Sequence, residues 1–243
     1  MTPKQAHDIT RDNAGNAIGQ ATGNVKTATD AGPAGTSYQL SADLLATRTT
    51  GQWHDGTGPA TGITSIEIDS RKCCAGSLFI ALPGATADGH EFIGAAARNG
   101  AVAALVTKPD ANIALPQLVV TDVAVALDAL GTETRTAHAA AGGQLVGITG
   151  SVGKTGSKEM LAHLLCRTPG STGCVASRAS FNNHLGVPLT LSLLPDARSD
   201  TGVAPAVQEM GMNAAGEISQ LSRMARPDVA VITCIADSHA GFF

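Results

Sequence analysis

The stretch Leu145-Val-Gly-Ile-Thr-Gly-Ser-Val-Gly-Lys-Thr155 decides the fold of this chain of 243 residues. Its first part, residues 145–149, is an apolar run of the kind that forms a buried β-strand. A tight glycine turn follows at 150–153, and a helix begins with Lys154 and Thr155. Such a turn cradles phosphate, because its backbone N–H groups close on the oxygens and the helix dipole favours negative charge. The sequence therefore predicts an α/β sheet with a phosphate-binding loop at one strand end.

The residues that we expect to bind ATP are those of the turn and the helix start: Gly150, Ser151, Val152, Gly153, Lys154 and Thr155. The ammonium of Lys154 would reach the outer phosphates, and the hydroxyl of Thr155 would ligate Mg²⁺. The general pattern G-x-x-x-x-G-K-[ST] is not met, because Ile148 stands at the position of the first glycine. A glycine-rich turn before an ordinary helix is the alternative, but the strand, the lysine and the threonine together favour the phosphate site.

The composition favours α/β layers built from small aliphatic side chains, because 43% of the residues are hydrophobic and only 3% are aromatic. The net charge is −4 and no basic block is present, which argues against nucleic acid and acidic membrane surfaces as partners. No apolar run approaches the roughly 20 residues that span a bilayer, so we expect a cytoplasmic protein without membrane insertion. The five cysteines lack metal-ligand spacing, and we interpret them as reduced thiols.

Strand and helix signals alternate along most of the chain. Strands are predicted at 63–68, 77–82, 101–106, 118–121, 145–149 and 174–176, near 207, and at 229–235. Helices are predicted at 43–45 after a Ser41 cap, at 92–98, 123–141, from 154 onward, at 187–194 and at 217–225. Residues 50–61 are expected to form a loop. The continuous apolar run at 229–235 is typical of a central parallel strand. The alternation predicts two parallel α/β sheets in tandem.

Three segments follow from this pattern. Residues 1–36 carry almost no large apolar side chains, and we expect them to form a disordered extension. Residues 37–142 form the predicted first α/β domain, which ends at a glycine pair. Residues 143–243 form the predicted second domain, which contains the phosphate loop.

Two further polar residues of the second domain follow predicted strands. Glu209 comes at the end of the strand near 207, and His239 comes shortly after the strand at 229–235. Ligands of parallel α/β sheets bind at the carboxyl ends of strands, so a carboxylate and an imidazole there can both reach a Mg²⁺ ion beside the phosphates. Taken singly, each residue is more typical of a solvated surface position, but their shared placement favours the metal site.

The sequence also resembles the Mur ligases, in the branch that adds D-alanyl-D-alanine to UDP-N-acetylmuramoyl-tripeptide. The resemblance covers most of residues 37–239. It is carried by Ile68–Arg71, Gly76–Leu82, Asp88–Phe92, Gly147–Met160, Ser180–Thr190, Glu209–Ile218 and Leu221–Val229. The shortened phosphate loop is the form that this family uses. The resemblance implies a UDP-binding α/β domain followed by an ATP-binding domain with a P-loop-type parallel sheet.

The resemblance also implies catalytic roles. Lys154 would bind the β- and γ-phosphates of ATP, and Thr155 would bind Mg²⁺. Glu209 and His239 match positions that hold a second Mg²⁺ between the γ-phosphate and the acceptor carboxylate. The reaction would phosphorylate the terminal carboxylate of UDP-N-acetylmuramoyl-tripeptide, and the amine of D-alanyl-D-alanine would then attack the acyl phosphate.

Four residues match substrate positions of the family. Ser70 and Arg71 would contact the UDP portion of the acceptor, and the planar guanidinium of Arg71 suits a diphosphate. Its alternative is a surface arginine at a strand end. Asn182 and Asn183 match positions near the acceptor peptide, and a turn held by local hydrogen bonds is an equally good interpretation of this pair.

The chain departs from the family at its end. In the family the central domain runs on past the histidine to a carbamylated lysine, and a third domain follows. We therefore expect a partial central domain with an exposed sheet edge, a chain that is inactive alone, and a monomer. Two alternatives stay open: a nucleotide- or UDP-sugar-binding remnant without catalysis, and a Mur ligase of another muropeptide step.

Overall fold

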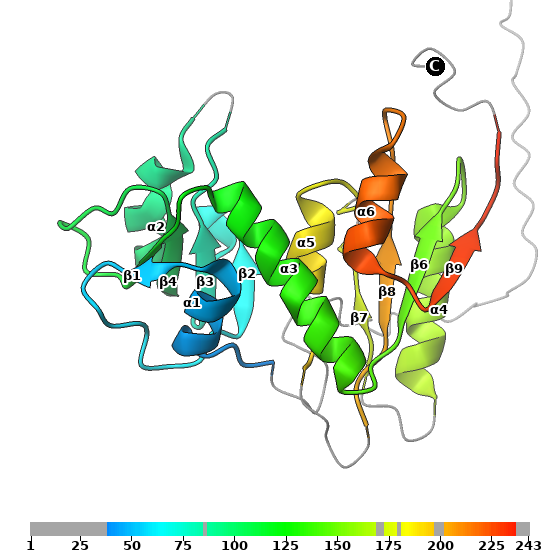
Figure 1. Ribbon diagram of the computed structural model, residues 1–243, viewed down its shortest axis with the longest axis horizontal. Helices are drawn as coiled ribbons and strands as arrows, with labels where there is room; N and C mark the ends of the chain where they lie inside the picture. The colour runs from blue at the N-terminus through cyan, green and yellow to red at the C-terminus, as the bar shows by residue number, and fades with distance from the viewer. Residues whose placement is uncertain (1–37, 85–86, 169–172, 179–180, 197–201, 237–243) are drawn as a thin grey trace, which may run out of the picture.

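A computed structural model describes residues 38–84, 87–168, 173–178, 181–196 and 202–236 (Figure 1). The chain forms two separate β-sheets that lie side by side, with the long helix α3 (Val123–Ala140) running between them. This arrangement confirms the predicted α/β class. The predicted disordered extension at 1–36 lies outside the described residues. No helix in the described part of the chain is long and apolar enough to cross a membrane.

The first sheet has five strands in the order β1-β5-β4-β3-β2. The strands are β1 (Gln52–Trp53), β2 (Ser65–Glu67), β3 (Ser77–Ile80), β4 (Ala101–Val106) and β5 (Gln117–Val119). Strands β2 to β5 are parallel to one another, and β1 is antiparallel to β5. The expected loop at 50–61 was therefore wrong at β1, because two residues between turns are too few to show a strand periodicity.

The helices of the first unit begin where the sequence supplies a side-chain cap. The hydroxyl of Ser41 accepts a hydrogen bond at the start of α1 (Ala42–Thr49), and the carboxylate of Asp122 accepts two at the start of α3. Helix α2 (Ile93–Arg98) continues from the short 3₁₀ helix η2 (Gly89–Phe92). A second 3₁₀ helix, η1 (Ser70–Lys72), follows the end of β2.

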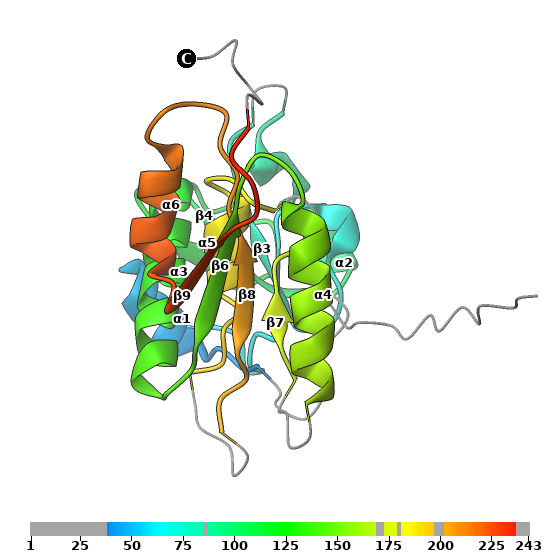
Figure 2. The same cartoon turned by 90° about the vertical axis from the view of Figure 1, so that its right-hand side faces the viewer.

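The second sheet has four parallel strands in the order β7-β8-β6-β9. The strands are β6 (Leu145–Thr149), β7 (Val175–Ala176), β8 (Ala206–Glu209) and β9 (Val229–Ile232). Helix α4 (Lys154–Arg167) covers one face, and helices α5 (Gly186–Leu191) and α6 (Glu217–Ala225) cover the other, where α3 joins them (Figure 2). The register pairs Ile148 of β6 with Glu209 of β8, so the loop after β6 starts beside Glu209.

Strand β9 corrects one prediction. Its apolar run was expected to form a central strand, but in the described residues β9 pairs only with β6 and lies at the edge of the sheet. All four of its residues are exposed, and Ile232 keeps 61% of its surface. An apolar run shows that a strand suits a buried place, but it does not show which neighbours cover that place. Within the described residues β9 forms an exposed sheet edge, and the expected partial central domain stays a prediction.

One apolar cluster crosses from the first unit into the second. Buried side chains of β2 to β5 and of α3 form a single cluster, and Leu189 and Leu193 from the α5 region of the second unit belong to the same cluster. Helix α3 therefore contacts both units. The division at 142/143 stays a prediction.

Candidate active site

The loop after β6 has the backbone shape of a phosphate cradle. Gly150 and Gly153 have φ values of +137° and +84°, and a Cβ atom at Gly150 would lie 2.3 Å from Thr233 Oγ1. Glycine is therefore required at both turns. Gly153 is also the N-cap of α4, and no side chain caps this helix start. The first-turn N–H groups of α4 and its dipole are thus available to an anion.

The phosphate loop is held in place by the chain that follows β9. The N–H of Ser151 donates to the carbonyl of Cys234 at 2.8 Å, and the hydroxyl of Thr233 donates to the carbonyl of Val152 at 2.5 Å. These two bonds fix the loop from outside its own segment. The sequence did not reveal this anchoring, because it joins residues more than eighty positions apart.

Lys154 begins α4, and its side chain folds back over the loop. Its ammonium donates to the carbonyl of Gly150 at 2.6 Å and lies 3.4 Å from the carbonyl of Ser151. The same side chain lines a cleft of about 300 Å³, which is bounded by the segments 182–184, 211–213 and 217–221. A cation at the loop and at the rim of a cleft can neutralise phosphate oxygens that enter from the cleft.

Glu209 is the centre of the site. It ends β8, its side chain is 2% exposed, and its backbone N–H donates to the hydroxyl of Ser177. One carboxylate oxygen accepts a hydrogen bond of 2.9 Å from the hydroxyl of Thr155, and the other accepts one of 2.9 Å from the amide of Asn182. The structure therefore brings together three of the predicted site residues, Thr155, Asn182 and Glu209.

Thr155 and Glu209 fit a magnesium ion. A hydroxyl and a carboxylate are hard oxygen ligands, and Mg²⁺ is commonly held by one or two carboxylates together with the phosphates of a substrate. Within the described ranges, no group of three His, Cys, Asp or Glu side chains offers a complete metal site. His239, the third predicted metal ligand, lies outside the described residues.

Lys158 belongs to the same cluster and was not predicted. Its side chain is fully buried, its ammonium donates to the carbonyl of Ser177 at 2.9 Å, and it lies 3.0 Å from Glu159 Oε1 and 4.0 Å from Glu209 Oε2. A buried ammonium near a buried carboxylate offsets part of the cost of desolvating the two charges. Lys158 follows Lys154 by four residues, so both lie on the same side of α4. This spacing is the feature of the sequence from which Lys158 could have been predicted.

The two asparagines have different surroundings. The amide of Asn182 contacts Glu209, as described above. The side-chain oxygen of Asn183 accepts hydrogen bonds from the N–H groups of Leu185 and Gly186 at the start of α5. Asn183 therefore stabilises a local turn, while the expected place of the pair near the acceptor peptide stays a prediction.

Ser70 and Arg71 lie in the first unit, on η1. Ser70 is buried, and its carbonyl accepts a hydrogen bond from Asn99. The side chain of Arg71 is 87% exposed and forms two hydrogen bonds, of 2.9 and 2.8 Å, with the carboxylate of Asp69. These bonds hold the pKa of Asp69 below its ordinary value. The structure does not bring this pair into contact with the phosphate loop.

Comparisons with known proteins cover both units. Residues 62–140 match the family described as "Mur ligase family, catalytic domain", and residues 148–243 match "Mur ligase middle domain". The UDP-N-acetylmuramoyl-tripeptide–D-alanyl-D-alanine ligase of Haemophilus influenzae is 36% identical over 178 residues, which are 73% of this chain and 37% of that protein. The corresponding ligase of Bacillus subtilis is 40% identical over 186 residues, which are 74% of this chain and 37% of that protein.

Solved structures agree with these relatives. The crystal structure of MurF from Acinetobacter baumannii matches with a TM-score of 0.70 and 36% identity, over 84% of this chain and 43% of that one. MurF from Thermotoga maritima, solved in complex with ADP, matches with a TM-score of 0.54 and 30% identity, over 72% of this chain and 38% of that one. The chain thus spans less than half the length of the relatives that it matches. On this evidence the chain belongs to the Mur ligase family.

Proposed function

We propose that this chain carries the acceptor-binding and ATP-binding parts of a ligase that adds D-alanyl-D-alanine to UDP-N-acetylmuramoyl-tripeptide in peptidoglycan precursor synthesis. Relatives with this activity in their names are 36% and 40% identical to it over nearly three quarters of its length. Because the chain corresponds to 37% of each of these relatives, the activity is proposed for the protein of which these residues form part.

The observation that carries the proposal is the contact of Thr155 and Asn182 with Glu209 beside the phosphate loop. A phosphate loop alone suits any nucleotide-binding protein. A buried carboxylate at the next strand end, held through both oxygens, adds a fixed anionic ligand to that loop. The adjoining cleft offers room for the end of a second substrate next to the γ-phosphate.

In the proposed reaction a carboxylate oxygen of the tripeptide attacks the γ-phosphorus of ATP, and ADP leaves. The amine of D-alanyl-D-alanine then attacks the acyl carbon, phosphate leaves, and the amine nitrogen loses a proton. The loop N–H groups and Lys154 would hold the phosphates in line. Bound Mg²⁺ would neutralise the two anions as they approach, and Thr155 and Glu209 would hold it. Asn182 would keep the Glu209 carboxylate in a fixed orientation.

The first unit would bind the UDP end of the acceptor. Ser70 and Arg71 follow the carboxyl end of β2, at the edge of a parallel sheet where ligands commonly bind. The guanidinium of Arg71 would then exchange Asp69 for a diphosphate, which offers the same paired oxygens. We propose residues 37–142 and 143–243 as the corresponding domains.

Isothermal titration of the folded chain tests this proposal. We expect UDP-N-acetylmuramoyl-tripeptide to bind more tightly than UDP-glucose, because only the former extends from the first unit toward Glu209. We also expect ATP with Mg²⁺ to bind at the phosphate loop. If a chain shown to be folded by circular dichroism binds ATP but does not distinguish the two UDP compounds, the acceptor assignment is wrong.

A further inference from the structure

One buried ion pair joins the carboxyl-end edges of the two sheets. Glu67 is the last residue of β2, and Arg178 follows the end of β7 by two residues. The guanidinium donates to both carboxylate oxygens, at 2.7 and 3.0 Å, and the two side chains are 8% and 17% exposed. A bidentate pair with this burial holds its partners at a defined distance and angle.

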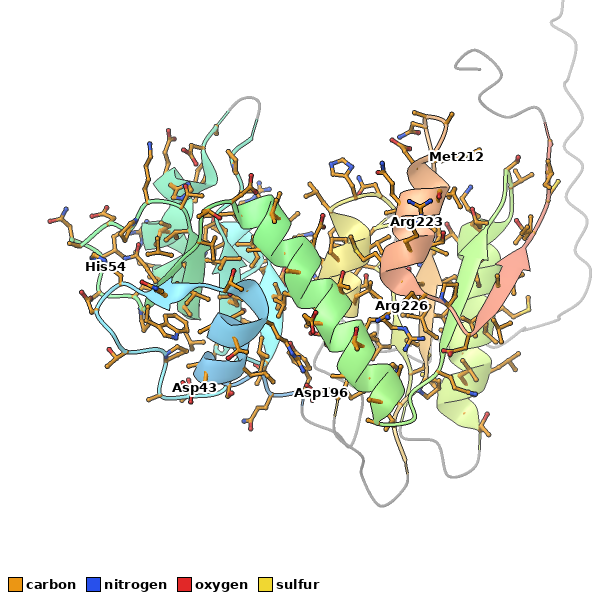
Figure 3. All side chains as sticks on the ribbon, viewed as in Figure 1. Asp43, His54, Asp196, Met212, Arg223 and Arg226 are labelled. Atoms are coloured by element: carbon orange, nitrogen blue, oxygen red, sulfur yellow. The ribbon has the colours of Figure 1, made fainter. Side chains whose placement is uncertain are left out.

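Two other polar contacts between the units lie at the opposite edge. Arg48 pairs with Asp196 at 2.6 Å, and His138 donates to the carbonyl of Pro195 at 2.7 Å. Both partners come from the segment after α5 that leads toward the amino end of β8. Figure 3 shows Asp196 at the far end of the second unit from Met212, which follows the carboxyl end of β8. Among the ion pairs of the described residues, Glu67–Arg178 is the one between the carboxyl-end edges.

The neighbours of this pair belong to the two ends of the proposed acceptor site. Three residues after Glu67 comes Ser70, the first proposed contact for UDP. Directly before Arg178 comes Ser177, whose carbonyl accepts from Lys158 and whose hydroxyl accepts from the backbone N–H of Glu209. The ion pair therefore connects the segment that would hold UDP with the segment that holds the carboxylate of Glu209.

We propose that Glu67 and Arg178 are positioning residues that set the span between the UDP end and the phosphate end of the acceptor site. This inference rests on the proposed function, because it concerns a ligand that touches both units. Such a ligand requires the two edges at a fixed separation, whereas a ligand of one unit does not. The pair thereby selects acceptors by the distance from their diphosphate to their terminal carboxylate.

Replacing Arg178 tests the inference through three ligands. For Arg178→Met we expect the affinity for UDP-N-acetylmuramoyl-tripeptide to fall by about tenfold, equivalent to about 1.4 kcal/mol. The affinities for UDP, which the first unit alone would hold, and for ATP, which the second unit alone would hold, should stay unchanged. Arg178→Lys should recover part of the loss, because an ammonium can still pair with one oxygen of Glu67.

Arg48→Met is the matched control. It removes an ion pair between the same two units at the opposite edge, so thermal stability should fall while the three affinities stay as in the original chain. If Arg178→Met fails to fold, the double variant Glu67→Gln with Arg178→Met removes both charges and leaves no unpaired buried charge. We expect the same selective loss for it.

The outcomes separate the two proposals. Equal affinity of the original chain for UDP-N-acetylmuramoyl-tripeptide and UDP would overturn the proposed function and this inference with it. Selective binding by the original chain that survives in the Arg178 variants would overturn only the inference. If the Arg178 variants lose affinity for all three ligands to the same extent, the ion pair serves stability alone, and this result would also overturn the inference.

Discussion

At the scale of single residues, Thr155 and Glu209 stand 54 positions apart and share a hydrogen bond of 2.9 Å. The carboxylate can only accept, so the hydroxyl of Thr155 donates to it, and the two lone pairs of that hydroxyl remain available to a cation. The same geometry thus orients the carboxylate and prepares the hydroxyl as a ligand. A threonine or a glutamate considered alone would not indicate this shared geometry.

Thr155→Val tests this arrangement, because it keeps the shape of the side chain and removes the hydroxyl. We expect the affinity for ATP in the presence of Mg²⁺ to fall by about tenfold to a hundredfold, as with other groups that orient metal ligands. The affinity for ATP in the presence of a chelator should stay unchanged, since the loop N–H groups and Lys154 are intact. Thr155→Ser is the control and should behave like the original chain. Titration calorimetry measures both affinities, and an equal loss with and without Mg²⁺ would contradict the role.

At the scale of elements, β9 presents an open edge. Within the described residues it pairs with β6 on one side only, and its four apolar residues are exposed. Unpaired backbone groups beside exposed apolar side chains favour pairing with another chain. Thr233 and Cys234, which directly follow β9, contact the phosphate loop, so this edge of the sheet also supports that loop. The edge at β9 therefore supports the site and can also pair with another copy of the chain.

Ile232→Lys should reduce this association. A lysine at an exposed position of an edge strand opposes edge-to-edge pairing through its charge and its hydration. We expect light scattering at increasing protein concentration to show less self-association than for the original chain. Val125→Lys, which adds the same charge at an exposed position of α3, serves as the control. Equal effects of the two substitutions would attribute the change to net charge rather than to the edge of β9.

At the scale of the whole molecule, α3 joins the two units. On one side its apolar residues enter the core of the first sheet, and on the other its polar residues reach the second unit. The guanidinium of Arg135, 2% exposed, donates to the carbonyls of Ala225 and Arg226 and to the carboxylate of Asp228. The side chain of Arg226, labelled in Figure 3 near α3, returns a hydrogen bond to Thr136. These contacts fix the second sheet against the helix.

His138 makes this junction sensitive to pH. Its ring is buried, its Nδ1 donates to the carbonyl of Pro195, and burial lowers its pKa below the ordinary value. The unfolded chain therefore binds a proton more readily, so the free energy of unfolding is highest above the unfolded pKa of about 6.5 and falls as the pH drops below it. Urea unfolding at about pH 7.5 and about pH 5.5 should show this loss.

His138→Asn is the matched variant, because its amide can donate to the same carbonyl and does not titrate. The difference in unfolding free energy between the two pH values should be smaller for it than for the original chain. An unchanged difference would assign the pH dependence to other groups.

The sequence by itself determined the local parts of this protein. The strand at 145–149, the glycine turn and the start of α4 were predicted correctly, and so were β4 and α6 with their bounds. Each depends on residues within a few positions of one another, where backbone preference and apolar periodicity act directly. The candidate ligands were also named from the sequence, Thr155 from the phosphate-loop pattern and Glu209 from its place at a strand end.

Only the tertiary structure decided which of these parts meet. Strand β8 lies between β7 and β6, and this order brings Glu209 beside the phosphate loop and leaves β9 at the edge. The buried Lys158 and the pairing of Arg178 with Glu67 depend on the same packing. Strand order and burial are fixed by contacts between distant segments, which compete in free energy over the whole chain. No short stretch of sequence contains that information, because it belongs to the packed arrangement of all segments together.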